Sequence, residues 1–163
     1  MPELVDAFKA VAEQGDMEAQ FSLGFVYASS LGVAQDYKQA MFWYEKAAAQ
    51  GHSKAQFQLG LKCEKGEGVK LDYNMAANWY AKAAEQRHAG AQLNLGVLYY
   101  EGKGVAQDYV EAHKRFTIAE INGNSNAISN RSVIEGNMTQ EQIAEAQQRA
   151  NAWITTHSRG KDA

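Results

Sequence analysis

Residues 55–86 read AQFQLGLKCEKGEGVKLDYNMAANWYAKAAEQ, and nearly the same pattern stands 36 residues earlier and 36 residues later. The loop inside this stretch, KGEGVKLDY from Lys65, is matched by SSLGVAQDY from Ser29 and by EGKGVAQDY from Glu101. A catalytic loop is normally needed once, whereas a structural connector is needed in every repeat. A fixed period of this length is typical of helical repeat proteins. The sequence therefore predicts an all-α fold of 36-residue helix-turn-helix repeats.

Each repeat is expected to contain two helices, the first over about residues 17–28 and the second over about residues 37–48 in the first copy. Alanine, leucine and glycine recur in the first helix at i, i+4 and i+5, which places them on one face. Glycine inside a helix costs about 1 kcal/mol relative to alanine, so its recurrence predicts a close helix–helix approach. The recurring positions include Ala19/Ala55/Ala91, Gln20/Gln56/Gln92, Leu23/Leu59/Leu95, Gly24/Gly60/Gly96, Ala40/Ala76/Ala112, Tyr44/Tyr80/Phe116 and Ala47/Ala83/Ala119.

The connecting loop carries a glycine and an aspartate in every copy. Gly32, Gly68 and Gly104 are expected to shape the turn, because glycine adopts a positive φ without steric cost. Asp36, Asp72 and Asp108 stand where an N-cap of the second helix is needed. In two copies a further residue, Gln39 or Glu111, is expected to complete a capping box with this aspartate. The recurring glutamine of the first helix is expected to hydrogen-bond the backbone between repeats, and the alternative is that it lines the groove.

The composition excludes several classes of function. The net charge of −3 offers no basic footprint for nucleic acid, and no apolar run reaches the roughly 18–20 residues of a membrane span. Cys63 is the only cysteine, so an intrachain disulfide is excluded. The first ten residues are too polar for a secretory signal. We expect a cytoplasmic protein, or a periplasmic or secreted one if a leader is missing, with no cofactor and no metal.

The ends of the chain depart from the repeat. Residues 3–13 match a second helix without its first, and the last copy changes to a different pattern in which Thr139 and Gln142 predict a capping box. A degenerate, polar end unit is what a repeat stack needs in order to finish. The predicted organisation is a single domain over residues 1–155, made of an N-terminal capping helix (1–14), three full repeats (15–50, 51–86 and 87–122) and a degenerate repeat with a C-terminal capping helix (123–155), followed by a flexible tail (156–163).

These repeats resemble Sel1-like repeats, which are relatives of the tetratricopeptide class. The pattern A-Q-x-x-L-G, then G-x-G-V, D-Y, W-Y and A-A, is complete in the middle copy and recurs in tandem on either side of it, with Ser30 as a departure in the first copy and Arg115, Phe116 and Glu120 in the third; the resemblance covers residues 1–155. It implies a right-handed α/α superhelix whose first helices line a concave groove, and a non-enzymatic scaffold or adaptor for other proteins. Ser30 stands where the family usually has a glycine. The lone Cys63 separates the chain from the subgroup that pairs two cysteines in each repeat.

Residues that recur in every copy are accounted for by folding, so recognition is expected at first-helix positions that vary. We predict a protein or peptide ligand in the groove of a monomer, held by side-chain amides and small apolar pockets. For the apolar residues Phe25, Leu61 and Val97, the alternative to partner binding is that they are part of the hydrophobic core. The predicted partner-binding residues are Ser22, Phe25, Ser29, Gln58, Leu61, Glu64, Lys65, Asn94, Val97, Tyr100 and Glu101.

Two other functions stay open. A hydrolase acting on cell-wall or β-lactam-like substrates would show a deep pocket with a strongly perturbed pKa. Ser158 and Lys161 have the Ser-x-x-Lys spacing of penicillin-recognising enzymes, but their place in a terminal tail argues against a catalytic serine. A self-assembling module would instead expose a large apolar patch on an end unit. His52 and His88 are expected to be solvated turn residues rather than metal ligands, and Cys63 is expected to be a core residue.

Overall fold

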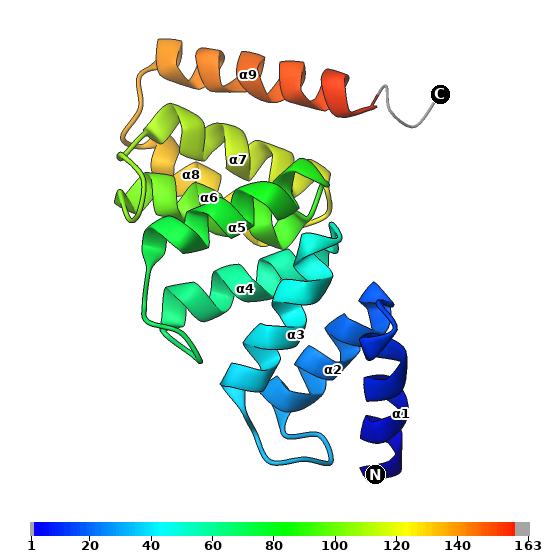
Figure 1. Ribbon diagram of the computed structural model, residues 1–163. Coiled ribbons are helices and arrows are strands. Elements are labelled where there is room, and N and C mark those ends of the chain that lie inside the picture. The colour runs from blue at the N-terminus through cyan, green and yellow to red at the C-terminus, as the bar shows by residue number, and fades with distance from the viewer. Residues whose placement is uncertain (1, 159–163) are drawn as a thin grey trace. The chain divides into compact units, whose positions relative to one another are not determined.

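The computed structural model describes residues 2–158, and in that range the chain forms nine α-helices and no strand (Figure 1). The prediction of an all-α fold of helix-turn-helix repeats is confirmed. None of the described helices is both long and apolar enough to cross a membrane. The helices are α1 (Pro2–Glu13), α2 (Met17–Ser29), α3 (Tyr37–Ala49), α4 (Ser53–Lys65), α5 (Tyr73–Glu85), α6 (Ala89–Glu101), α7 (Tyr109–Ile121), α8 (Asn126–Glu135) and α9 (Gln140–Ser158).

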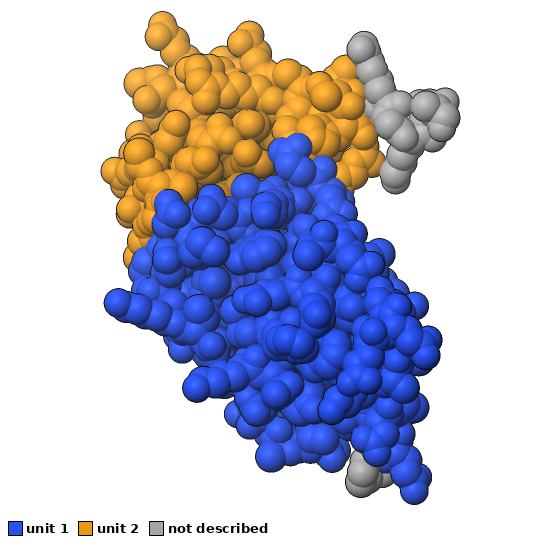
Figure 2. Space-filling model, viewed as in Figure 1, with its two compact units in different colours: residues 1–86 blue, residues 87–163 orange. Residues whose placement is uncertain are grey.

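The chain divides into two compact units, residues 1–86 and residues 87–163 (Figure 2). Unit 1 contains α1 and two complete helix pairs, α2–α3 and α4–α5. Unit 2 contains the pair α6–α7, followed by α8 and α9, both of which pack against α7. In each pair, a helix of the A-x-x-x-L-G type comes first, and we call it the first helix.

A glycine of each first helix lies directly against an aromatic ring of the second. A Cβ at Gly24 would lie 2.6 Å from Cδ1 of Tyr44, and one at Gly96 would lie 2.7 Å from Cε1 of Phe116. Gly60 has the same relation to Tyr80. Real Cβ atoms do not approach so closely, so each ring occupies the space that a side chain would need. The predicted close helix–helix approach is confirmed in all three pairs.

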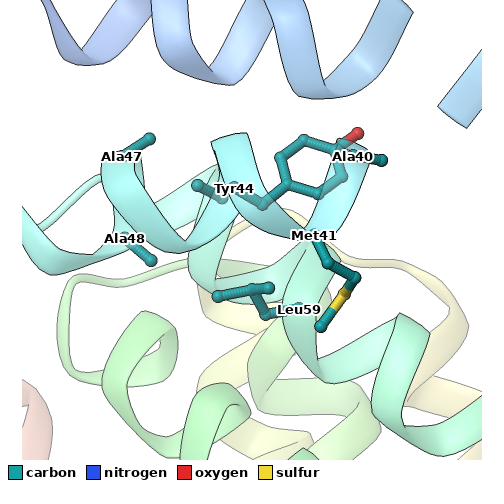
Figure 3. Close-up of a cluster of buried hydrophobic side chains, with 7 residues drawn as sticks. Ala40, Met41, Tyr44, Ala47, Ala48 and Leu59 are labelled. Carbon is teal, nitrogen blue, oxygen red and sulfur yellow. The ribbon is translucent and has the colours of Figure 1, made fainter. Parts of the chain in front are cut away.

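Small residues let the next helix pack tightly on the other side of the ring. Tyr44 is fully buried in a cluster that combines α3 with the first helix of the following pair, α4 (Figure 3). Four of the other six residues of this cluster are alanines. The cluster consists of Ala40, Met41, Tyr44, Ala47, Ala48, Ala55 and Leu59.

The recurring aspartates cap the second helices, but the predicted capping boxes do not form. The Asp108 carboxylate accepts a hydrogen bond from the amide of Glu111 at 3.0 Å. A capping box also needs the amide of Asp108 to donate a hydrogen bond to the Glu111 side chain. This amide donates to the carbonyl of Tyr99 instead, at 2.9 Å. The same bond joins Asp36 to Tyr27. Each aspartate therefore starts the second helix and ties it to the last turns of the first helix.

The recurring glutamine links successive repeats, as predicted. The Nε2 of Gln56 donates to the carbonyl of Ala48 at 3.2 Å, near the end of the preceding second helix. Its Oε1 accepts from Nε2 of Gln86 at 2.8 Å. Gln92, in unit 2, accepts from Asn122 in the same way at 2.9 Å. Gln56 thus bonds to a carbonyl near the end of α3 and to the side chain of Gln86, the residue that follows the end of α5.

His52 and His88 are helix caps. The expectation of a solvated turn residue is wrong for His52, which is buried, whereas His88 is only partly buried. His52 is buried, its Nδ1 accepts from the amide of Ala55 at 3.2 Å, and its Nε2 lies 3.1 Å from Glu18. His88 caps α6 through Nδ1 and the amide of Ala91 at 3.1 Å. The first helices start with a free amide that needs an acceptor, and an unprotonated imidazole nitrogen supplies it.

The C-terminal part follows its own plan. Thr139 and Gln142 form the predicted capping box, with hydrogen bonds of 2.9 and 3.1 Å. The helix that it starts, α9, turns Ala146 and Ala150 into the core. It continues to Ser158, so it enters the segment predicted as a tail, whose remainder, residues 159–163, lies outside the described residues.

We predict that Ser30→Gly stabilises the protein. Ser30 ends α2 with φ of 58°, whereas Gly66 and Gly102 hold the equivalent positions with φ of 69° and 67°. A side chain in the left-handed region costs about 1–2 kcal/mol, which glycine avoids. Glycine also raises the conformational entropy of the unfolded chain, which offsets part of this gain, so we expect the free energy of unfolding to rise by about 0.5–1 kcal/mol. Urea denaturation measures it. Ser29→Gly, one residue earlier inside the helix, should lower the same quantity; a loss from Ser30→Gly would contradict the account.

Candidate functional site

The predicted partner-binding residues lie on one face of each first helix. Their spacing of i, i+3 and i+7 brings them above one another on the helix surface. None of them is fully buried. The exposed members are Phe25, Ser29, Lys65 and Glu101, and the partly buried ones are Ser22, Gln58, Leu61, Glu64, Asn94, Val97 and Tyr100.

On α6, three of these residues come together with α7 and α8. Val97, Tyr100 and Glu101 line a hollow of about 180 Å³. This volume is smaller than the roughly 300–1,000 Å³ of pockets that enclose a drug-sized molecule, and it suits a single side chain. Most of its lining is apolar, and we call it the α6–α8 hollow. Its other lining residues are Phe116, Asn130 and Val133.

The way in which α8 is anchored leaves the hollow open. Ala127 and Ile134 are buried against α7 in one cluster with Phe116. Glu135 is held by the buried His113, whose Nε2 lies 2.8 Å from the carboxylate. Val133, on the other side of α8, is therefore left 62% exposed at the edge of the hollow.

On α4, Glu64 already has a partner within the fold. The Tyr80 hydroxyl donates to the Glu64 carboxylate at 2.5 Å. In the preceding pair Ala28 takes the position of Glu64, and the Tyr44 hydroxyl is buried without a hydrogen-bond partner among the described residues. Burial raises the pKa of this phenol above its ordinary value. In unit 2 the ring is Phe116, which carries no hydroxyl. Glu64 thus has a structural role that its variable position did not reveal.

Glu67, in the loop between α4 and α5, interacts with residues of its own repeat and of the preceding one. A hydrogen bond from Tyr37 lowers the pKa of the Glu67 carboxyl, and Lys62, whose Nζ lies 3.4 Å away, lowers it further. The backbone of Tyr37 also lies where a Cβ of Gly68 would be, at 2.6 Å from its carbonyl oxygen. The loop between α4 and α5 thus rests on Tyr37 of the preceding repeat.

A larger hollow, of about 500 Å³, was not predicted from the sequence. It lies between α1 and α3, where the half-exposed Phe42 ring meets Trp43 edge-on at 5.0 Å, and Lys46 lies 5.0 Å from the centre of the Phe42 ring. The signal for it is Phe42 itself, since the equivalent positions hold Asn78 and Lys114. Its lining residues are Lys9, Ala12, Glu13, Gly15, Gln20, Gln39, Phe42, Trp43 and Lys46.

The residues considered for catalysis are placed in structural roles. Cys63 is buried, as predicted, and burial raises the pKa of its thiol, which disfavours the nucleophilic thiolate. Ser158 donates its hydroxyl to the carbonyl of Ile154 at 2.7 Å, and Lys161 lies outside the described residues. Across residues 2–158, no group of three His, Cys, Asp or Glu side chains is arranged to hold a metal ion.

The chain is similar to a known repeat family and to solved structures. The family model of the Sel1 repeat matches residues 18–52, 53–88 and 89–114. c5321, a protective antigen present in uropathogenic Escherichia coli strains and displaying an SLR fold, is 39% identical with a TM-score of 0.88 over 96% of this chain and 33% of that protein. The chain thus spans about a third of the length of c5321. No curated protein matches the chain significantly.

Two further solved structures are similar. A Sel1 repeat protein from Oxalobacter formigenes is 35% identical with a TM-score of 0.72, over 81% of this chain and 98% of that one. Helicobacter pylori cysteine rich protein B is 26% identical with a TM-score of 0.61, over 77% and 95%. The fold class predicted from the sequence is confirmed by these similarities.

We predict opposite outcomes for the same substitution in two repeats. Tyr80→Phe removes the hydrogen bond to Glu64 and should lower the free energy of unfolding by about 1.5 kcal/mol, the scale of a bond to a charged group. Tyr44→Phe removes a buried hydroxyl that has no partner and should leave stability unchanged or raise it. Chemical denaturation of both variants decides; equal losses would show that the Tyr44 hydroxyl has a partner of comparable strength.

Proposed function

The chain belongs to the Sel1 repeat family, and on this premise we propose that it is a non-enzymatic scaffold that binds a protein or peptide along its first helices. Sel1-like repeat proteins are generally protein-interaction scaffolds, and the family is typically non-catalytic. Within unit 2 the proposed surface is the variable face of α6, and within unit 1 the variable faces of α2 and α4 are candidates of the same kind.

The α6–α8 hollow is the observation that carries this proposal. Val97, Phe116 and Val133 offer an apolar lining, and Glu101 and Asn130 stand beside it. An apolar side chain of a peptide would enter the hollow, while the Asn130 amide is available to hydrogen-bond peptide backbone. This division between an apolar centre and a polar rim is common in protein interfaces.

The energetic advantage of such a site lies in its rigidity. The glycine–ring contact between α6 and α7 and the anchoring of α8 by Ile134 hold the lining residues before a partner arrives. Little ordering of the scaffold then opposes binding, so more of the contact energy appears as affinity. The partner supplies the conformational change, as an extended or helical segment that orders on the surface.

We predict that Val133→Asp weakens peptide binding at least about tenfold, a change of about 1.4 kcal/mol. Peptides selected from a displayed library against the immobilised wild-type chain provide the ligands, and isothermal titration calorimetry measures their affinity for each variant. Val133 is largely exposed, so its replacement should leave the fold intact, which circular dichroism checks.

The matched control is Ile121→Asp, an equally drastic change at an exposed apolar residue of α7 that does not line the hollow. It should bind the selected peptides as the wild type does. If Val133→Asp also bound them unchanged, or if no peptide were enriched, the α6–α8 hollow would not be the recognition site.

A further inference from the structure

The hollow of about 500 Å³ between α1 and α3 is a second place where unit 1 can hold a ligand, and we call it the α1–α3 hollow. Its volume falls within the roughly 300–1,000 Å³ of sites that enclose a ligand, whereas the α6–α8 hollow has about 180 Å³. The half-exposed Phe42 ring and the buried Trp43 ring, which meet edge-on, give it an aromatic wall. The α1–α3 hollow thus has room for several side chains of a partner.

The opening of this hollow does not depend on what precedes α1. Lys9 and Glu13 are the exposed residues of α1 that line it. The corresponding residues of α3, Glu45 and Ala49, are exposed as well, although α3 packs against both α2 and α4. A helix that packed on α1 as α2 packs on α3 would therefore leave the hollow open.

The lining residues divide into those that recur in the next repeat and those that do not. The recurring pairs are Ala12/Ala48, Gly15/Gly51, Gln20/Gln56, Trp43/Trp79 and Lys46/Lys82. The pairs that differ are Lys9/Glu45, Glu13/Ala49, Gln39/Met75 and Phe42/Asn78. Residues that serve only the fold are expected to recur. The differing residues therefore mark this hollow as a place of recognition in one repeat.

The polar groups of the lining are not equally available to a ligand. The Gln20 amide is already used, because its Nε2 donates to the carbonyl of Ala12 at 3.1 Å and its Oε1 accepts from Nε2 of Gln50 at 2.9 Å. The Gln39 side chain, by contrast, is exposed and makes no hydrogen bond within the described part of the chain. Gln39 can therefore bond the backbone of a peptide in the hollow.

The charges of the lining favour an anionic ligand. Among the described residues, neither Lys9 nor Lys46 forms an ion pair, and the Lys46 Nζ lies 5.0 Å from the centre of the Phe42 ring. Glu13 is the single carboxylate among the lining residues, so two ammonium groups face one carboxylate in a chain whose net charge is −3. This local reversal of sign is complementary to an acidic partner and steers its encounter.

The positions of these groups define the ligand further. Lys9 belongs to α1 and Lys46 to α3, so a ligand that pairs with both ammonium groups spans the hollow. The half-exposed Phe42 ring, which also belongs to α3, offers a face or an edge to a second aromatic ring. A segment with an aromatic side chain between carboxylates satisfies both conditions.

We propose that the α1–α3 hollow is a second binding site, which takes an acidic segment of a partner protein with an aromatic side chain between carboxylates. The aromatic side chain packs on Phe42, the carboxylates pair with Lys9 and Lys46, and the Gln39 amide bonds the backbone of the segment. The hollow lies in unit 1 and the α6–α8 hollow in unit 2, so the two sites can be tested separately.

A short synthetic peptide provides the probe. Fluorescence anisotropy of labelled Asp-Glu-Phe-Asp-Glu, titrated with the full chain at low salt, measures binding. We expect a Kd below about 1 mM, and an affinity that falls as salt screens the ammonium groups. Two control peptides, Asp-Glu-Ala-Asp-Glu and Lys-Lys-Phe-Lys-Lys, remove the aromatic side chain and the negative charge in turn, and each should bind at least fivefold more weakly.

We expect Lys9→Glu/Phe42→Asn to reduce the affinity for the acidic peptide at least tenfold. The new residues are those that α3 and α5 carry at the corresponding positions, so they suit the repeat fold, which circular dichroism checks. Lys46→Glu should cause a similar loss. Its matched control is Lys82→Glu, the same change at the equivalent residue of α5, where Nζ lies 4.6 Å from the centre of the Trp79 ring but does not line the hollow.

Several outcomes would overturn the proposal. They are the absence of binding to the wild-type chain at millimolar peptide, equal binding of the three peptides, and an affinity that Lys9→Glu/Phe42→Asn leaves unchanged. Equal losses from Lys46→Glu and Lys82→Glu would also overturn it, because the attraction would then come from the charge of the whole chain. Val133→Asp should leave binding of the acidic peptide unchanged, which separates this site from the α6–α8 hollow.

Discussion

The contact between a glycine and an aromatic ring sets the geometry of every complete repeat. Gly24, Gly60 and Gly96 give up side-chain packing and helix propensity, and the rings of Tyr44, Tyr80 and Phe116 fill the space that is left. Alanine recurs one turn before and about one turn after each ring, at Ala40/Ala76/Ala112 and Ala47/Ala83/Ala119, and all six are fully buried. The recurring aspartates and glutamines then satisfy the backbone groups that the short connections would otherwise leave without partners.

This division of labour separates folding from recognition. The residues shared by the repeats make contacts within and between helix pairs. They are therefore not available to distinguish one binding partner from another. Variation is tolerated on the outer faces of the first helices, where Val97, Tyr100 and Glu101 line a hollow with α8. It is also tolerated in α8, which departs from the repeat pattern and lines the same hollow.

The periodicity predicted most of the fold because each recurring residue has one dominant physical reason to be there. It failed where a local group had two possible partners. The capping box at Asp108 was wrong because the amide that it needs is already bound to Tyr99, a contact that depends on loop geometry. His52 was assigned to solvent because histidine is an uncommon cap. At the candidate site, Val97, Tyr100 and Glu101 were found from their variability, whereas Asn130 and Val133 were not, because α8 departs from the repeat pattern. Glu64 was assigned to partner binding because its position varies, yet it accepts a hydrogen bond from the Tyr80 hydroxyl and so has a structural role.

The sign of the stability change in Gly60→Ala tests the central claim most directly. Inside an ordinary helix this substitution stabilises by about 1 kcal/mol, because alanine has the higher helix propensity. If the Tyr80 ring occupies the space of the new methyl group, the free energy of unfolding measured in urea should fall instead, by about 1–3 kcal/mol. A rise would mean that the glycine–ring contact does not set the distance between the helices.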